Sequence, residues 1–154
     1  TGGRVFCVDG DPQVLAFVDA GLQGRPTNIE LQMVHQDLVT LSEGRSVQDL
    51  PACDVIVLNG LIDHLPARLI GSLLSRCKSS LRDGGVVVVM AMAPSKDARF
   101  VDHLLRWPLM RRTREELVGL CQAAGLTVLD TGNPKKDDDV GLIVGASVSV
   151  NGQS

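Results

Sequence analysis

The chain has 154 residues, of which 44% are hydrophobic and 3% aromatic, and its formal net charge is −3 at neutral pH. This length favours a single domain, and a weakly acidic chain without a basic stripe argues against a nucleic-acid partner, which would need clustered Lys and Arg. No apolar run is long enough to cross a bilayer, so no membrane span is expected.

Three apolar runs of strand length each lead to a polar residue, and helical or loop sequence separates them. They cover residues 4–9, 29–35 and 54–58. Near-continuous apolar runs are typical of parallel strands that are buried on both faces. Ligands of open α/β sheets bind beyond the carboxyl ends of the strands, so polar side chains that follow these runs are expected at one crevice of a single sheet.

Helices are predicted around these strands. Asp11 caps the first, with Pro12 at its first position, and glycines end it. Thr113 and Glu116 form a capping box at the start of the last. The predicted extents are residues 12–21, 66–81 and 113–125, with a further short helix around residues 47–50.

The most hydrophobic strand, residues 86–92, follows a turn signal at residues 83–85 and is expected at the centre of the sheet. The last two strands, residues 126–129 and 140–150, have no crossover helix between them, which predicts an antiparallel pair. Right-handed crossovers then give an α/β fold with a doubly wound, mostly parallel sheet and an antiparallel C-terminal strand. The expected domain covers residues 1–150, and residues 151–154 form a disordered tail.

Cysteine usage bears on both location and metal binding. The four cysteines form no CxxC pair, and no cluster with metal-ligand spacing is present, so no metal site is expected. Buried thiols are predicted, in a reducing cytoplasm. A basic cluster, formed by Arg106, Arg111, Arg112 and Arg114, is either an anion site or a solvated helix start, and the solvated helix start is favoured.

Five stretches of the sequence resemble class I S-adenosylmethionine-dependent methyltransferases, which have a Rossmann-like fold. In chain order they are VFCVDGDPQVLAF, VHQDL, DVIVLNGLIDHL, LRDGGVVVVMAM and RTREELVGLCQAAGL. The stretches NGLIDHL and LLRWPLMRRTREEL are similar to one bacterial subgroup, whose members are often labelled 3-hydroxy fatty acid methyl ester synthases. The resemblance implies S-adenosylmethionine as cofactor and methyl transfer to a small or lipid-like substrate, with a carboxylate among the candidates.

The resemblance also implies which residues bind the nucleoside part of the cofactor. Asp9 matches the acidic residue that accepts hydrogen bonds from both ribose hydroxyls, and a carboxylate has enough acceptor sites for a vicinal diol. Gly10 lets the backbone approach the cofactor closely. Asp37 matches the acidic residue near the adenine amino group, and Leu38 offers its backbone amide to a ring nitrogen. The simpler alternatives are a turn at Asp9 and a helix cap at Asp37.

Asn59 and Gly60 follow the strand that lies nearest the transferred methyl group in this family. The sequence lacks an Asn-Pro-Pro-Tyr type of motif there, which disfavours methylation of nucleic-acid bases. Asp63 and His64 lie just beyond, and His64 is a tentative catalytic residue, either as a general base or by orienting a substrate acid. A solvent-facing histidine is the alternative. Residues 93–112 are apolar and either cover the crevice as a lid or pack on the core.

The family's first strand and its glycine-rich Asp-x-Gly-x-Gly loop have no counterpart in the sequence. The sheet is therefore expected to lack its first β-α unit and half of the cofactor pocket, and the partner is expected to be the remainder of a larger chain or a second copy of this one. Two other functions stay open. One is a non-catalytic Rossmann-like interaction or regulatory module, and the other is an NAD-binding dehydrogenase fragment, against which the absence of any Tyr weighs.

Overall fold

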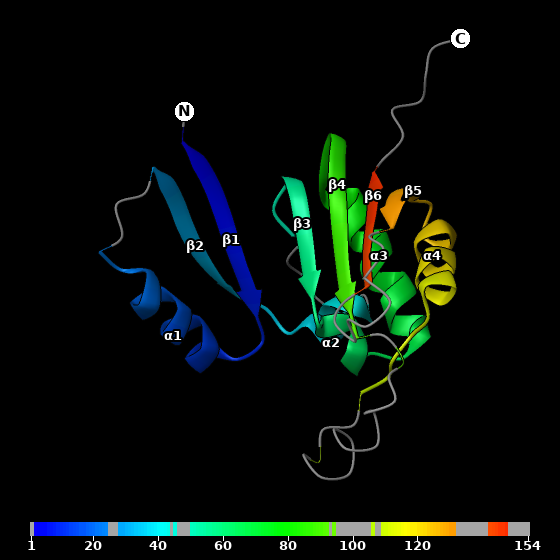
Figure 1. Ribbon diagram of the computed structural model, residues 1–154. Coiled ribbons are helices and arrows are strands. Elements are labelled where there is room, and N and C mark those ends of the chain that lie inside the picture. The colour runs from blue at the N-terminus through cyan, green and yellow to red at the C-terminus, as the bar shows by residue number, and fades with distance from the viewer. Residues whose placement is uncertain are drawn as a thin grey trace. The chain divides into compact units, whose positions relative to one another are not determined.

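The computed structural model describes residues 2–24, 28–43, 45, 50–92, 94, 106, 109–131 and 142–147. The chain comprises two compact units, Thr1–Pro51 and Ala52–Ser154. Each unit has its own parallel strands alternating with helices (Figure 1). The α/β fold class predicted from the sequence is therefore confirmed.

The first unit is built on a parallel pair of strands, β1 (Gly3–Asp9) and β2 (Ile29–His35). Helix α1 (Pro12–Leu22) connects them, and the short helix α2 (Leu38–Ser42) follows β2. Helix α1 starts as predicted, because the Asp11 side chain accepts a hydrogen bond from the Gln13 amide at 2.8 Å and satisfies one of the unpaired amides of the first turn.

The second unit contains a four-stranded sheet in the order β3-β4-β6-β5. Strands β3 (Cys53–Asn59) and β4 (Leu81–Ala91) are parallel, and β6 (Leu142–Ser147) runs antiparallel to both β4 and β5 (Thr127–Thr131). In Figure 1 the arrowhead of β6 points opposite to those of β3 and β4. The antiparallel C-terminal strand and a β4 flanked on both sides were both predicted and are confirmed.

Within the described residues, this unit contains the 3-10 turn η1 (Leu61–His64), helix α3 (Ala67–Ser80) and helix α4 (Arg114–Ala123). The capping box at the start of α4 is present, with Thr113 and Glu116 each bonding the other's backbone amide. Much of the core lies on α3, whose buried apolar residues recur at helical spacing: Leu69, Ile70, Leu73, Leu74 and Cys77.

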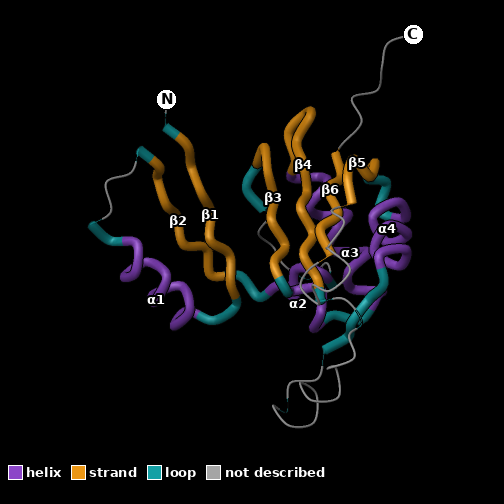
Figure 2. Tube along the Cα trace, in the orientation of Figure 1, coloured by secondary structure: helices purple, strands orange, loops and turns teal. Residues whose placement is uncertain are grey.

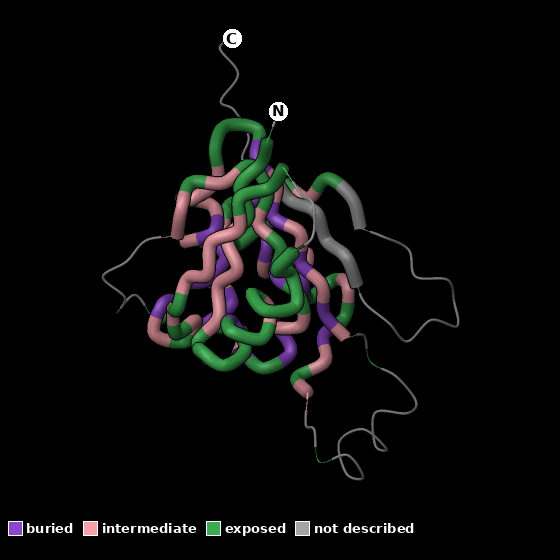
Figure 3. Tube along the Cα trace, turned by 90° about the vertical axis from the view of Figure 1, so that its left-hand side faces the viewer, coloured by how far each residue is buried: buried purple, intermediate pink, exposed green. Residues whose placement is uncertain are grey.

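One face of the β3–β4 pair is buried and the other is open. On the buried face Val87, Val89 and Ala91 alternate along β4. Figure 3 marks the buried parts of the chain in purple. On the opposite face Val55 and Val57 of β3 remain 57% and 56% exposed. We call Val55 and Val57, with their partly buried partners Val86 and Val88 on β4, the apolar open face of this sheet.

One local prediction was wrong in position. Residues 83–85 were predicted to form a turn before the strand, but they lie inside β4. The pairing of β4 with β3 shifts in register there, between Cys53 and Val55. Leu81 already pairs with Cys53, so the strand begins earlier than its apolar run. A short helix that was not predicted lies at Leu38–Ser42, directly after its cap at Asp37. The short helix predicted around residues 47–50 stays a prediction, because residues 46–49 lie outside the described part of the chain.

The expected continuous sheet is represented by two separate ladders, β1-β2 and β3-β4-β6-β5. Within the described residues no strand pairs with the second edge of β1 or of β3 (Figure 2). The lack of the first β-α unit stays a prediction. A single domain over residues 1–150 stays a prediction, and the tail at 151–154 lies outside the described residues.

None of the helices in the described ranges is long and apolar enough to cross a membrane.

Candidate functional site

In the first unit the candidate residues lie at the carboxyl ends of β1 and β2. Asp9 and His35 form the last pair of the parallel ladder, and the Asp9 carbonyl accepts a hydrogen bond from the Gln36 amide at 2.9 Å. Gly10 continues from β1, and Asp37 follows β2 by two residues. The structure therefore brings Asp9, Gly10 and Asp37 together at one edge of this small sheet, as the parallel pattern predicted.

The Asp9 carboxylate begins a turn and still has acceptor capacity. One oxygen, Oδ1, accepts a hydrogen bond from the Asp11 amide at 2.8 Å, which is the turn foreseen as the simpler alternative. The other oxygen makes no hydrogen bond with the described residues, and an ionised carboxylate offers about four lone-pair sites. The turn thus orients the carboxylate and leaves acceptor sites for the two hydroxyls of a diol.

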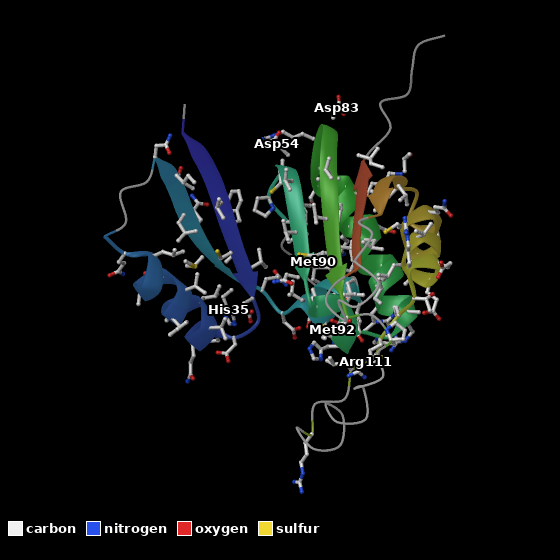
Figure 4. The ribbon with its side chains drawn as sticks, in the orientation of Figure 1. His35, Asp54, Asp83, Met90, Met92 and Arg111 are labelled. Atoms are coloured by element: carbon white, nitrogen blue, oxygen red, sulfur yellow. The ribbon has the colours of Figure 1, made fainter. Side chains whose placement is uncertain are left out.

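Gly10 is held by the neighbouring strand. The His35 side chain donates a hydrogen bond from Nε2 to the Gly10 carbonyl at 3.0 Å, so this histidine has a structural role (Figure 4). A Cβ atom added at Gly10 would lie 3.5 Å from the Asp37 Cα, which is an ordinary contact. The fold itself therefore does not require glycine here.

Asp37 caps helix α2. Its Oδ1 accepts hydrogen bonds from the amides of Val39 at 2.8 Å and Thr40 at 3.2 Å, and its Oδ2 accepts one from the Thr40 hydroxyl at 2.8 Å. These bonds, first among them the one from the Thr40 side chain, hold the pKa of the Asp37 carboxyl below its usual range. The cap uses most of the acceptor sites of the Asp37 carboxylate. Asp37 therefore has fewer acceptor sites left for adenine than Asp9 has for ribose. The Leu38 amide is not among the donors to this cap.

In the second unit the candidates lie at the carboxyl ends of β3 and β4. Asn59 pairs with Met90 at the end of the ladder, and its side chain is exposed. The Gly60 amide donates to the Met90 carbonyl at 3.0 Å. Gly60 has φ +70°, a left-handed conformation that favours glycine and turns the chain from β3 into η1. His64, which is exposed, ends η1.

A buried carboxylate lies beside these residues and was not among the predicted site residues. Asp63 is 2% exposed, and both of its carboxylate oxygens accept from the Met92 amide, at 3.0 and 3.2 Å. Burial raises the pKa of the Asp63 carboxyl, and the Met92 hydrogen bond and electrostatic interactions with His64, Arg112 and Arg111 oppose that shift. The signal in the sequence is an acidic residue three positions after the glycine that follows a strand.

A buried arginine completes this region. Arg112 is 8% exposed, and its Nη1 donates to the carbonyls of Ile62 at 2.7 Å and Met110 at 2.8 Å, while its Nη2 donates to the Leu65 carbonyl. The prediction that the basic cluster is a solvated helix start was therefore wrong for Arg112. A planar guanidinium with five donors can satisfy several carbonyls that converge from different segments, and sequence spacing alone does not reveal that convergence.

The two sets of candidates belong to different units. Asp9, Gly10, Asp37 and Leu38 lie in the first, and Asn59, Gly60 and His64 in the second. The convergence of both sets on one cleft stays a prediction. Most of residues 93–112, predicted as a lid or a core-packing segment, lie outside the described residues. The described ranges contain no group of three or more His, Cys, Asp or Glu that could hold a metal ion.

No protein-family model matches the sequence, and comparison with curated proteins finds no relative. Solved structures do match. A possible exported protein from Bordetella parapertussis is 19% identical with a TM-score of 0.78, and the match covers 94% of this chain and 53% of the other. The magnesium protoporphyrin IX methyltransferase ChlM from Synechocystis PCC 6803, solved with bound SAH, is 14% identical with a TM-score of 0.71, over 95% of this chain and 64% of the other.

The mitomycin 7-O-methyltransferase MmcR is also similar, with 18% identity, a TM-score of 0.73, and coverage of 95% of this chain and 42% of the other. Likeness at such low identity establishes the fold alone. The chain thus has the Rossmann-like fold of class I methyltransferases, and it spans between about two fifths and two thirds of the length of these three structures.

Proposed function

We propose that this chain is part of an S-adenosylmethionine-dependent methyltransferase and that its first unit binds the nucleoside portion of the cofactor. The observation that carries the proposal is the arrangement at the carboxyl edge of β1 and β2, where the turn-oriented Asp9 carboxylate keeps unused acceptor sites. The similarity in fold to ChlM, which was solved with bound SAH, supports the choice of cofactor.

In this proposal Asp9 accepts hydrogen bonds from the two ribose hydroxyls, and Gly10 allows the cofactor to approach the backbone. The Leu38 amide donates to an adenine ring nitrogen, and the remaining lone pair of Asp37 accepts from the adenine amino group. Asp9 is the strongest of these assignments, because most of the Asp37 carboxylate already serves the cap of α2.

The second unit then supplies the residues around the methyl acceptor. The cofactor carries an electrophilic methyl group, so the protein has to hold the acceptor in line and exclude water. Asn59 and Gly60 would border the reacting groups, as the resemblance implies. A carboxylate acceptor needs no base. An alcohol acceptor would need one, and His64, exposed at the end of η1, is the candidate general base.

The proposed substrate is a small or lipid-like molecule. The apolar residues within 93–112 support it, because apolar side chains that contact a substrate favour a hydrocarbon chain over a charged polymer. A fatty or 3-hydroxy fatty acid is the finer form of this proposal, and it rests on the resemblance of NGLIDHL and LLRWPLMRRTREEL.

The proposed partner is the remainder of a larger chain, with a second copy of this chain as the alternative. Support comes from the apolar open face of β3–β4, from the edges of β1 and β3 that pair with no described strand, and from the share of each similar structure that this chain covers.

The proposed location is the cytoplasm, because all four cysteines are thiols and none is in a disulfide.

The deciding experiment is a calorimetric titration of S-adenosylhomocysteine into this chain and into a version extended at its N-terminus. Binding by either form supports the proposal, and binding by the extended form alone would show that the cofactor site needs the preceding segment. No binding by either form contradicts it.

A non-catalytic interaction module is the second candidate, and one observation favours it. Large apolar side chains are exposed in both units, including Phe17 at 80% and the two valines of β3. Failure to bind the nucleoside, combined with concentration-dependent self-association, would favour this candidate. Quenching or enhancement of NADH fluorescence on mixing would instead indicate a dehydrogenase fragment.

A further inference from the structure

Asp63 links two chain segments that leave the sheet of the second unit. Its carboxylate holds the amide of Met92, the first residue beyond β4, through both oxygens. Its own backbone carbonyl accepts a hydrogen bond from the Met110 amide at 2.8 Å. Met92 immediately precedes the stretch 93–112 and Met110 lies close to its end, so Asp63 bonds the backbone near both ends of that stretch.

Arg112 also contacts the turn that contains Asp63. Its guanidinium donates to the Ile62 and Leu65 carbonyls on either side of Asp63, and also to Met110. The segment after β3, the segment after β4 and the segment before α4 therefore meet at Asp63 and Arg112, which we call the Asp63–Arg112 anchor. Figure 4 shows Met90, Met92 and Arg111 toward the end of β4 that lies away from Asp54 and Asp83.

The anchor borders the proposed acceptor site directly. The Asp63 amide donates to the Gly60 carbonyl at 3.2 Å, and His64 is the next residue. The direction in which Asn59 and His64 are presented thus depends on a four-residue turn that Asp63 fixes to β4. Burying a carboxylate is costly unless hydrogen bonds and opposite charge compensate, and Met92 and the nearby arginines supply that compensation.

We propose that Asp63 is a positioning residue for methyl transfer: its carboxylate fixes η1 to the end of β4, and so sets the placement of Asn59 and His64 toward the methyl acceptor. This inference rests on the proposed function of the chain. Asp63 touches neither acceptor nor cofactor in this scheme and acts through the turn that it holds.

The first test measures the anchor without any substrate. Amide hydrogen exchange at Met92 should be slowed in the wild-type chain, about tenfold or more faster in Asp63→Ala, and close to wild type in Asp63→Asn, which keeps one acceptor oxygen. Asp54→Ala is the matched control, because Asp54 lies at the other end of β3 in an exposed ion pair with Arg82. Equal exchange at Met92 in Asp63→Ala and in the wild type would overturn the proposal.

The second test uses the form of the protein, this chain or its extended version, that binds S-adenosylhomocysteine. Transfer of labelled methyl groups to decanoate and 3-hydroxydecanoate is followed for each variant. Asp63→Ala should lower kcat about tenfold or more while the Kd for S-adenosylhomocysteine stays within about twofold, and Asp63→Asn should recover most of kcat. Asp54→Ala should match the wild type.

An unchanged kcat in Asp63→Ala would overturn the positioning role while the proposed function stands. Equal losses in Asp63→Ala and Asp63→Asn would also overturn it, because the loss would then not follow the Met92 hydrogen bond. If the wild type neither binds the nucleoside nor transfers methyl groups, the proposed function fails and the positioning role falls with it, whereas the exchange result at Met92 still reports on the anchor by itself.

Discussion

Thr40 donates two hydrogen bonds to Asp37, from its amide to Oδ1 at 3.2 Å and from its hydroxyl to Oδ2 at 2.8 Å. The hydroxyl bond is the largest cause of the lowered pKa of Asp37. Because the charged carboxylate is favoured in the folded state, this interaction stabilises the fold above the unfolded pKa of about 3.8 and is lost as the pH falls through the lower, folded value.

We therefore expect Thr40→Val to raise the pKa of Asp37 toward its ordinary value and to weaken the dependence of stability on pH in the acid range. Carboxyl-carbon NMR titration of Asp37 measures the first effect, and thermal unfolding at several acid pH values measures the second. Ser79→Ala is the control, since the Ser79 hydroxyl bonds only a carbonyl within its own helix. An unchanged Asp37 titration in Thr40→Val would contradict the role assigned to the hydroxyl.

Asp9→Ala is expected to weaken S-adenosylhomocysteine binding by about 1–3 kcal/mol, the range for loss of a charged hydrogen-bond acceptor. The affinity of Asp9→Asn should lie between those of the wild type and Asp9→Ala, because asparagine keeps one oxygen that can accept from the Asp11 amide. Calorimetry on the binding-competent form measures both. If Asp9→Ala binds as tightly as the wild type, the ribose assignment is wrong.

Gly10→Ala distinguishes an effect on the stability of the fold from an effect on cofactor binding. The added Cβ makes only ordinary contacts with the protein, so the melting temperature should stay near that of the wild type. Nucleoside affinity should fall about tenfold or more, near 1.4 kcal/mol, if the cofactor approaches the backbone here. Gly3→Ala, at the other end of β1, has nothing within 4 Å of the added atom and should change neither quantity. Retained affinity in Gly10→Ala would exclude close approach of the cofactor.

Gly85→Ala should destabilise the fold. Its Cβ would lie 2.8 Å from the Arg82 carbonyl oxygen and 3.1 Å from that of Asp54, and backbone atoms at a register shift cannot easily move apart. A loss of about 1–3 kcal/mol is expected from denaturant unfolding. Gly119→Ala, in the exposed middle of α4 with open space around it, should instead stabilise by up to about 1 kcal/mol. A neutral Gly85→Ala would show that the strand relaxes there.

Cys77 and Cys121 should resist thiol reagents in the native protein. Both are buried, and burial raises the pKa of the Cys77 thiol to about 12. The thiolate is the reactive form, so both should label at pH 8 only when the protein unfolds. Mass spectrometry of iodoacetamide-treated protein, with and without denaturant, locates the labels. Rapid native labelling of Cys77 would contradict the buried core of α3.

Local signals in the sequence predicted most of the elements correctly. The apolar runs located β1, β2 and β3 to within a residue or two, and Asp11 and the Thr113–Glu116 pair marked helix starts, because capping involves atoms only two or three residues apart. The turn at Asp9 and the cap at Asp37 were both foreseen as alternatives for the same reason. The resemblance to methyltransferases placed these residues at the carboxyl ends of strands, where the structure has them.

Contacts between residues far apart in the chain required the folded structure. The sequence determined which segments become strands and helices, since periodicity and caps act within one turn or a few residues. Only the tertiary structure decided that Asp63 meets Met92, that Arg112 is buried among carbonyls fifty positions upstream, and that one face of β3–β4 is left apolar and open. Burial and hydrogen-bond partners of this kind depend on how the segments pack, and packing is a property of the whole assembly rather than of any local stretch of sequence.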